Sequence, residues 1–297
     1  MTVLNSELMA ETPNLTPRLT ADGSYTFFSS EFGECFHSHH GAYQEAVGKF
    51  VLPTGIPERA KQPQLTILDI CYGLGYNSAA ALECIWQVNP DCQVTLVALE
   101  SDPGVCVGAI ANQWLHHWSP RVQDTLTLLS TEHQVDHGCN AQLLIGDARQ
   151  TIQSLVRSGF VADAVFLDPF SPPHCPQLWT VEFLAQVRQC LHPNGILATY
   201  SCSAAVRAGL LAAGFQIGAS KPVGRRSPGT VASITAVFAL LSLQEQEHLQ
   251  TRAAIPYRDL TRQDTAETIC NSRRQAQQES KLEPTRQWKE RWFLPSP

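Results

Sequence analysis

The feature that most constrains the fold is an alternation of β-type and helical segments that begins near residue 64. Five apolar β-type runs are each followed by a stretch with helical character. Strands that alternate with helices form a parallel sheet covered by helices on both faces. The predicted strands are LTILDI, QVTLVALE, AQLLIGD, DAVFLD and GILATYS, and the predicted helices are 75–88, 103–117, 149–157, 179–191 and 203–213.

Two further β-type runs, GFQIG and TVASITAVFALL, end this alternation. The basic loop KPVGRRSPG joins them instead of a helix, so we expect an antiparallel pair at the end of the sheet. The predicted fold class is therefore α/β and Rossmann-like, with a mostly parallel seven-stranded sheet that finishes in an antiparallel pair.

The segments on either side of this sheet domain differ in character. SYTFFSSEFGECFHS has aromatic, turn-punctuated β character, GAYQEAVGKFVL is typical of a helix that runs into a short strand, and 264–292 indicates a helix with an irregular end. We predict a flexible N-terminus, an N-terminal β/α appendage, one main domain and a basic helical C-terminal extension, with bounds 1–22, 23–63, 64–243 and 244–297.

Charge and composition limit the binding partners, the cellular location and the cysteine redox state that we expect for this chain. Residues 201–297 carry a net charge of +5 and residues 1–200 a net charge of −11, which is compatible with docking a polyanion or with a solvated helical surface. No run reaches the ~18 apolar residues of a membrane span, and the N-terminus lacks a signal-peptide pattern, so we expect a cytoplasmic protein. The ten cysteines form no C-x-x-C pair, so we expect reduced thiols.

A glycine turn follows the first predicted strand in the sequence ILDICYGLGYNS. Gly73 and Gly75 would let a ligand approach the backbone, and the helix that follows presents free N–H groups. A plain strand-to-helix connection is the alternative. A dinucleotide site would need a third glycine, where this chain has Ser78.

Four carboxylates end successive predicted strands: Asp69, Glu100, Asp147 and Asp168. Ligands of open parallel sheets bind beyond these strand ends, and an acid after the second strand can accept both ribose hydroxyls. S-adenosylmethionine (SAM) carries no phosphate and needs only such groups, so we predict it as the cofactor. The predicted cofactor-binding residues in this region are Asp69, Gly73, Gly75, Asn77, Glu100, Asp147 and Ala148.

The tripeptide Asp168-Pro169-Phe170 indicates what accepts the methyl group. A carboxylate and a proline carbonyl can orient an amine by hydrogen bonds, and an aromatic face favours its positive charge. We therefore predict these three residues as catalytic. A rigid proline turn is an equally good interpretation of the tripeptide alone. HSHH at 37–40 has no accompanying metal-ligand spacing, so we predict no metal site.

Five motifs carry a family resemblance: FHSHHGAYQEAVGKFV at 36–51, LDICYGLGYNS at 68–78, LIGDAR at 144–149, LDPFSPPHCPQLW at 167–179, and AVRAGLLAAGFQI followed by GRRSPGTVAS. Over about residues 24–240 the sequence resembles the MnmC-like methyltransferases, the tRNA 5-aminomethyl-2-thiouridine methyltransferases, in the form without a fused flavin oxidase domain. The resemblance implies a class I SAM-dependent methyltransferase fold and methylation of the aminomethyl nitrogen of a wobble uridine in tRNA.

By this resemblance Asp168 takes the catalytic acid position, Glu45 is a glutamate near the cofactor, and Glu100 and Asp147 contact the cofactor. His174 and Cys175 stand where the family usually has lysine and asparagine, which concerns the substrate more than the cofactor. We predict that His174, Arg225 and Arg226 contact the substrate or tRNA, and that a separate flavin oxidase could supply the substrate.

Three other functions stay open at this point. The chain could methylate another amine, on a small molecule or a protein. An aminopropyltransferase uses the same fold, but it usually has more acids near its polyamine pocket. A non-catalytic module that binds SAM or tRNA would show SAM affinity without turnover.

Overall fold

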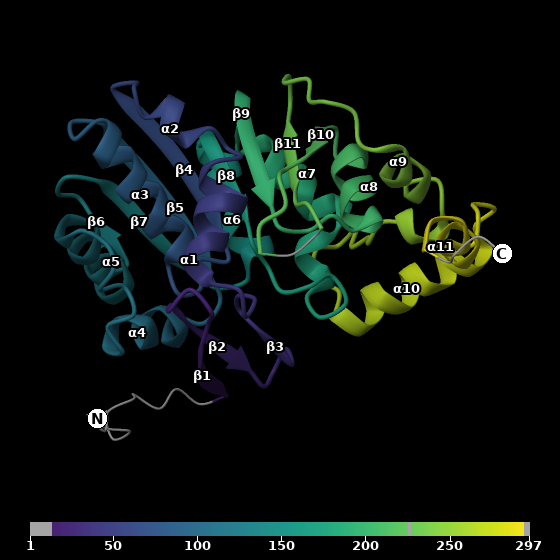
Figure 1. Cartoon of the computed structure of the whole chain (residues 1–297), viewed down its shortest axis with the longest axis horizontal. Helices are drawn as coiled ribbons and strands as arrows, with labels where there is room; N and C mark the ends of the chain where they lie inside the picture. Colours follow the sequence, from purple (N-terminus) through teal and green to yellow (C-terminus); the bar gives the residue numbers. More distant parts are fainter. Residues whose placement is uncertain (1–13, 225–226, 294–297) are drawn as a thin grey trace.

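The computed structural model describes residues 14–224 and 227–293, and an eight-stranded sheet forms its centre (Figure 1). The strand order is β10-β11-β9-β8-β4-β5-β7-β6. Five central strands pair in parallel, while β11 runs antiparallel to β9 and β10, and β6 runs antiparallel to β7. The strands are β4 Gln64–Ile70, β5 Gln93–Glu100, β6 Gln134–Val135, β7 Asn140–Ile145, β8 Ala162–Leu167, β9 Leu191–Thr199, β10 Gln216–Ala219 and β11 Thr230–Ser233.

Side chains of the central strands alternate between two apolar layers, one on each face of the sheet. On β4, Leu65 and Ile67 pack into the layer that contains α3 and α5, whereas Leu68 and Ile70 pack into the layer that contains α6, α7 and α8. This follows from the period of two in a strand. The helices are α3 Tyr76–Val88, α4 Pro103–Ala111, α5 Pro120–Glu132, α6 Ala148–Ser158, α7 Val181–Gln189 and α8 Ala204–Ala212, with a 3-10 turn η2 at Pro176–Trp179.

The N-terminal appendage consists of a small sheet and an irregular helix. Strands β1 (Leu15–Leu19), β2 (Tyr25–Ser29) and β3 (Glu34–Cys35) pair antiparallel. In Figure 1 they lie at the end toward which β9 points. Helix α1 (Ala42–Glu45) continues as a π-helical segment η1 (Ala46–Val51), followed by α2, Ile56–Arg59. Such π-helical turns occur frequently at functional sites.

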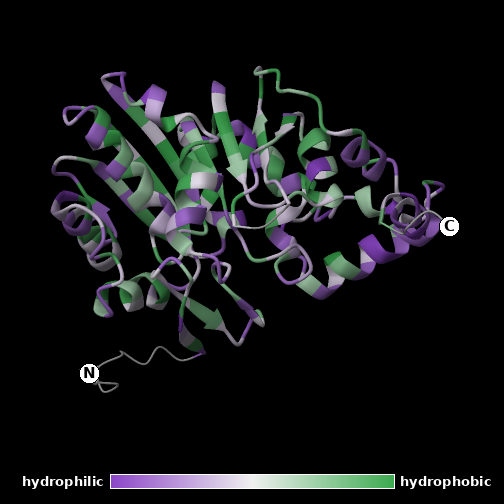
Figure 2. Cartoon of the chain, in the orientation of Figure 1, coloured by the Kyte–Doolittle hydropathy of each residue, from purple (hydrophilic) through white to green (hydrophobic). Residues whose placement is uncertain are grey.

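The segment predicted as a C-terminal extension is mostly helical in its described part, up to residue 293. It contains α9 Leu243–His248, a 3-10 turn η3 at Arg252–Ala254, α10 Ala266–Glu279 and α11 Thr285–Phe293. In Figure 2 the strands of the central sheet are largely hydrophobic, whereas α10 and α11 are mostly hydrophilic. Their buried contacts come from a few side chains, among them Ile269 of α10 and Trp288 of α11. No helix in the described part of the chain is long and apolar enough to cross a membrane.

The predicted order of strands and helices is confirmed, with differences at the edges. The two-residue strand β6 makes eight strands instead of seven, and it follows a helix, α5, that had no prediction. Strand β11 ends at Ser233 instead of running on to residue 241, because Phe238 folds back against Gly218 of β10.

Three further segments differ from their predictions. Residues 50–52 continue a helical turn and form no strand, because Phe50 and Val51 are buried in the layer that contains α3. Helix α4 ends at Ala111, with Gln113 in a left-handed conformation. Strand β1 lies within the predicted flexible segment 1–22, and α11 replaces the predicted irregular end.

Candidate active site

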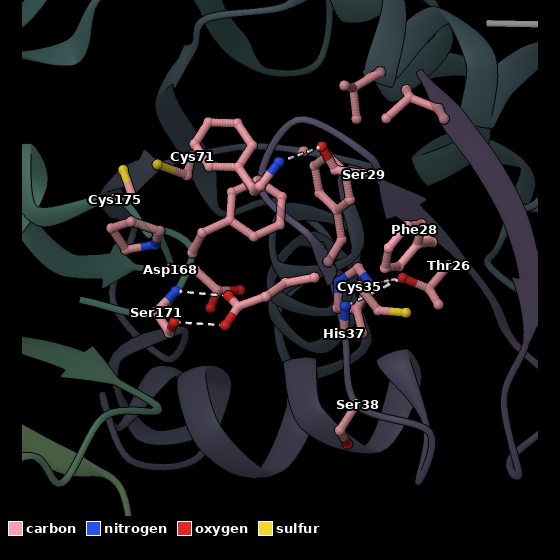
Figure 3. A pocket seen from close by; sticks show the side chains of 18 of the residues that line it. Thr26, Phe28, Ser29, Cys35, His37, Ser38, Cys71, Asp168, Ser171 and Cys175 are labelled. Atoms are coloured by element: carbon pink, nitrogen blue, oxygen red, sulfur yellow. Dashed lines mark hydrogen bonds between the residues drawn. The ribbon is translucent and has the colours of Figure 1, made fainter. Parts of the chain in front are cut away.

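A cavity of about 840 Å³ lies between the carboxyl ends of the central strands and the N-terminal appendage. This volume is within the ~300–1,000 Å³ of small-molecule sites. Its inner part is lined by residues that follow β4, β5 and β8, and its outer part by β1, β2, β3 and the segment before α1. Figure 3 shows side chains of both parts, with Asp168 and Cys71 on the inner side and Phe28 and Thr26 on the outer side.

The glycine turn after β4 forms one wall of the inner part. Gly73 has a φ of +56° and Gly75 a φ of +83°, conformations that side chains rarely adopt. A Cβ at Gly73 would meet the ring of Phe36 at 3.4 Å, and Gly73 lines the cavity while Gly75 does not. Gly73 therefore brings backbone to the cavity surface, and Gly75 caps the start of α3.

Glu100, at the end of β5, lines the cavity and is held by backbone donors. Its Oε2 accepts from the N–H of Gly73 at 2.8 Å, and its Oε1 accepts from the N–H groups of Ser101 and Asp102 at 2.8 and 3.0 Å. Burial raises the pKa of this carboxyl, and the three backbone bonds act in the opposite direction. The orientation of Glu100 is thus set by the turn that it faces, and Oε2 keeps capacity for a further donor.

Asp69 and Asn77 lie behind the cavity wall and are not among the residues that line it. Asp69 is fully buried and accepts from Ser78 Oγ at 2.6 Å, and burial raises its pKa to about 7. Asn77 Nδ2 donates to Asp168 Oδ2 at 2.9 Å. In this structure Asp69 supports the start of α3, and Asn77 links that helix to the acid after β8.

Asp168 lies where the inner and outer parts of the cavity meet. Burial raises the pKa of its carboxyl well above the ordinary value, the bond from Asn77 opposes this, and the negative charges of Glu45 and Asp69 add to the increase. A carboxylate with a raised pKa is a better proton acceptor for an amine than an exposed one. The raised pKa is compatible with acid–base work, and the catalytic role of Asp168 stays a prediction.

The two residues after Asp168 are held by aromatic neighbours. Phe170 stacks on Phe32 with ring centroids 4.3 Å apart and meets the edge of Phe36 at 4.8 Å. The Pro169 carbonyl accepts from Tyr200 Oη at 3.0 Å. Pro169 and Phe170 line the cavity. The Pro169 carbonyl already accepts one hydrogen bond, from Tyr200, and the Phe170 ring already contacts two other rings, so only part of each is left for the amine that they are predicted to bind.

Glu45 comes from α1 and also lines the cavity. Its carboxylate accepts from Ser38 N at 3.0 Å and Ser38 Oγ at 2.8 Å, and it forms an ion pair with Lys49, whose side chain is 3% exposed. Burial acts to raise the pKa of Glu45, but Lys49 and Ser38 outweigh it, so that the pKa lies below the ordinary value. The structure thus brings the predicted Glu45 into one cavity with Asp168 and Glu100.

Asp147 and Ala148 are outside the residues that line the cavity. Asp147 caps α6 and forms an ion pair with Arg149 at 2.7 Å, and Arg149 also contacts the buried Asp259 of the C-terminal extension at 2.9 Å. Their contact with the cofactor stays a prediction, and this geometry shows Asp147 directed toward a cation of its own helix.

The predicted substrate contacts have different outcomes. His174 is not among the residues that line the cavity, but it contacts two that are: its Nδ1 contacts the carbonyl of Phe32, and its Nε2 lies 4.0 Å from Glu34 Oε1. Arg225 and Arg226 lie outside the described residues. No group of three or more His, Cys, Asp and Glu side chains suited to a metal occurs in residues 14–224 and 227–293.

Sequence reasoning did not single out Lys49 and Glu34. Glu34 of β3 accepts from Ser171 N at 3.0 Å and from Ser171 Oγ at 2.5 Å, and these two bonds are drawn at Ser171 in Figure 3. Both residues belong to the appendage, far from β8 in the sequence. The only signal for Lys49 was its spacing of four from Glu45 on a predicted helix.

The inner part of the cavity fits SAM. A glycine without a side chain exposes backbone at one wall, and an oriented carboxylate, Glu100, faces the same space and can accept ribose hydroxyls. Apolar side chains, including Val105 and Leu178, complete this part of the lining.

Comparison with known proteins gives the same assignment. A family described as S-adenosyl-L-methionine-dependent methyltransferase matches residues 107–235. The crystal structure of MnmC2 from Aquifex aeolicus has a TM-score of 0.80 and 31% identity, covering 91% of this chain and 87% of that one. An uncharacterized protein of Methanocaldococcus jannaschii is 30% identical over 88% of this chain and 72% of its own length.

Longer proteins also match. The tRNA 5-methylaminomethyl-2-thiouridine biosynthesis bifunctional protein MnmC of Acidovorax sp. is 30% identical over 204 residues, which are 65% of this chain and 31% of that protein. The chain therefore spans about a third of the length of the bifunctional relatives that it matches. From its sheet order, its cavity and these relatives, the chain belongs to the MnmC-like family of S-adenosyl-L-methionine-dependent methyltransferases.

Proposed function

We propose that this methyltransferase acts on the aminomethyl nitrogen of a modified wobble uridine in tRNA. The observation that carries the proposal is the position of Asp168, buried at the junction of the two parts of the cavity and bonded to Asn77. The bifunctional relatives are named for 5-methylaminomethyl-2-thiouridine biosynthesis in tRNA, which supports the choice of acceptor.

The geometry suggests how the chain would promote the reaction. Bound SAM supplies an electrophilic methyl carbon on its sulfonium. A neutral amine that reaches Asp168 from the outer part of the cavity would form the new N–C bond with its nitrogen lone pair, and the proton that the methylated nitrogen then loses would pass to that carboxylate. The electron pair of the broken C–S bond stays on sulfur. Orientation and exclusion of water supply much of the rate in such a reaction.

The outer part of the cavity is suited to a planar acceptor delivered from outside. Phe28, Phe32 and Phe36 of the appendage lie along it, and Arg18 lies over the ring of Phe28 at 5.7 Å. A base extruded from an RNA loop can stack on aromatic side chains, while cations contact its phosphates. Exposed arginines of the C-terminal extension, and Arg225 and Arg226 by their charge alone, would add non-specific attraction to tRNA.

The proposed substrate must already carry an aminomethyl group, so an earlier reaction has to free that amine on the uridine. We retain the prediction that a separate flavin oxidase performs it. The purified chain should methylate tRNA that already carries the aminomethyl group without any partner in the assay. It should methylate tRNA with a blocked amine only after the oxidase has acted.

The replacement Asp168→Asn tests the proposed function. The amide keeps the size of the carboxylate but cannot take a proton, so methyl transfer should fall by roughly 10²- to 10⁴-fold. SAM binding, measured by calorimetry, should stay within a few-fold. The assay is single-turnover transfer of labelled methyl to an anticodon stem–loop RNA that carries 5-aminomethyl-2-thiouridine.

The control is Asp124→Asn, which changes an exposed aspartate on α5 in the same way. It should leave both transfer and SAM binding unchanged. Transfer at the parent rate by Asp168→Asn, or equal transfer to RNA without the amine, would remove the amine-directed mechanism. Methylation of a small amine in place of the RNA would favour the alternative substrate.

A further inference from the structure

The ion pair between Glu45 and Lys49 has no part in the mechanism above, although both residues line the cavity. Lys49 is on the π-helical segment η1, and its side chain is 3% exposed. Buried ion pairs add little stability compared with apolar side chains of similar size, so stability alone does not account for a lysine here. Such a cation also exerts a positive electrostatic potential on other groups inside the cavity.

Lys49 stands among acids at the place where the amine is proposed to react. Both charges of the pair affect the pKa of Asp168: Glu45 raises this pKa and Lys49 lowers it. Asp69 acts on Asp168 in the same direction as Glu45. Arg18, the other arginine or lysine along the described cavity wall, is exposed on β1. Lys49 is therefore the buried cation within this acidic wall.

An amine needs its lone pair in order to react, and neighbouring carboxylates act against that. Each negative charge near the amine favours its ammonium form, which cannot attack a methyl group. A cation in the same wall has the opposite effect and lowers the pKa of a nearby amine. Glu45 without a partner would thus hold the acceptor as an ammonium beside Asp168.

We propose that Lys49 offsets the charge of Glu45 and so keeps the acceptor amine in its neutral, reactive form. This inference rests on the proposed function, because it concerns the amine that Asp168 receives. Lys49 acts here through its field on the substrate and transfers no proton itself. The pair would work as a unit, Glu45 holding Lys49 in place and Lys49 limiting the negative charge of the wall.

The test is the pH dependence of transfer by Lys49→Met, which keeps an unbranched side chain and removes the charge. The pH at which single-turnover transfer reaches half its plateau should rise by about one unit, which lowers the rate near pH 7 by about 10-fold. The rate should return to the parent level by about pH 9 to 10. Glu45→Gln should move the half-plateau pH in the opposite direction, and Lys49→Arg should leave it in place.

A second measurement does not depend on turnover or on SAM. Calorimetry of RNA binding in two buffers of different ionisation enthalpy counts the protons released when the amine binds. At pH 7.5 the parent should release more protons with the aminomethyl RNA than with RNA that lacks the amine. Lys49→Met should reduce this difference. Lys49 also lowers the pKa of Asp168, and the difference between the two RNAs subtracts the protein titration, Asp168 included, that both RNAs cause.

Other titrating groups near Lys49 must be separated from the amine. His37, before α1, faces the pair from the appendage, and burial lowers its pKa to about 4, so it stays neutral in the assay. Asp69, behind Asp168, has a pKa of about 7 and titrates within the range. The shift caused by Lys49→Met should therefore persist in an Asp69→Asn background.

The matched control is Lys61→Met, which removes a lysine from an exposed ion pair with Glu58 on the surface. It should change neither the pH profile nor the proton count. A pH profile of Lys49→Met that matches the parent, or one lowered equally at all pH values, would overturn the Lys49 proposal and leave the proposed function intact. A parent that transfers no methyl group to the aminomethyl RNA at any pH would overturn both.

Discussion

The N-terminal appendage and the C-terminal extension both pack against the sheet domain, but only one of them reaches the cavity among the described residues. The appendage contributes Glu45 and Lys49 to the cavity wall, and Glu34 bonds directly to Ser171 in the loop after Asp168. The extension up to residue 293 lines no part of the cavity and docks mainly on helices, through pairs such as Arg149–Asp259 and Arg207–Glu245.

The difference indicates a division of roles between chemistry and stability. Contacts of the appendage lie around the proposed reaction site, so their loss should change transfer more than folding. The ion pairs of the extension are with helices such as α6 and α8, although Cys270 of α10 also approaches the Pro173 carbonyl in the loop after Asp168, at 3.9 Å. Loss of these ion pairs should therefore change folding more than transfer. Arg149 is an exception to this division, because it connects Asp259 of the extension to Asp147, a predicted cofactor contact.

The largest expected effect is on folding, from Asp259→Ala in the extension. The side chain of Asp259 is fully buried and accepts from Arg149 Nη1 at 2.9 Å, so its removal leaves a buried cation without one partner. Loss of one member of a buried pair costs about 3–5 kcal/mol of unfolding free energy. Urea unfolding followed by circular dichroism measures this, with the exposed Glu267→Ala as control.

Transfer by the folded Asp259→Ala protein should stay within about two-fold of the parent. A much larger drop in transfer, with SAM affinity also reduced, would mean that the extension acts on the cofactor through Arg149 and Asp147. The extension would then serve cofactor binding as well as folding.

The next effect is an acid sensitivity of the appendage. Burial lowers the pKa of His37 to about 4, below the 6.5 of the unfolded chain, although Glu45 partly opposes this. The unfolded state therefore binds the proton more readily, and the stability present above pH 6.5 is lost as pH falls toward 4. The full loss is about 3 kcal/mol, from ~1.4 kcal/mol for each pKa unit. Buried carboxyls with a raised pKa, such as Asp69, act in the opposite sense over this interval. The loss is therefore measured as the difference between the parent and His37→Gln in the change of unfolding free energy from pH 7 to pH 4.5.

His37→Gln should remove this loss, so that the change in unfolding free energy from pH 7 to pH 4.5 favours folding more in the variant than in the parent. The pKa of Asp259 is lowered by Arg149 and its other donors against the effect of burial, so its contribution is lost only below pH 3.8. The appendage should thus respond to acid before the extension does. An unchanged pH dependence in His37→Gln would assign the acid sensitivity elsewhere.

The smallest expected effect tests whether the appendage positions the loop after Asp168. Glu34→Gln keeps one acceptor but removes the charge that strengthens two bonds to Ser171, so transfer should fall about 10-fold. Unfolding free energy should change by less than ~1 kcal/mol. A double replacement with Ser171→Ala should be no worse than the stronger single replacement.

Glu132→Gln, an exposed change on α5, is the control for this experiment. Equal loss of transfer in Glu34→Gln and in Glu132→Gln would remove any specific role for the Glu34 bonds. A fall in stability that matched the fall in transfer would make Glu34 a folding residue, like those of the extension.

Much of the fold was accessible from sequence because its signals are local. The apolar runs of β4 and β5, the glycines at 73 and 75 and the helical stretches between strands each depend on near neighbours in the chain. Asp168 and Glu100 were predictable for the same reason, since parallel strands place their carboxyl ends at one edge. Local signals were weakest where an element is short, as for β6 and β11.

The sequence by itself thus determined the parallel sheet, the turn at Gly73 and the acids that end the strands, because periodicity and backbone preference are properties of short segments. Only the tertiary structure decided which charges surround those acids. Lys49 and Glu34 reach the site from more than a hundred residues before Asp168, and Asp147 is held by Arg149, which a distant Asp259 also contacts. Contacts between remote segments arise when whole layers pack, and no local pattern encodes them.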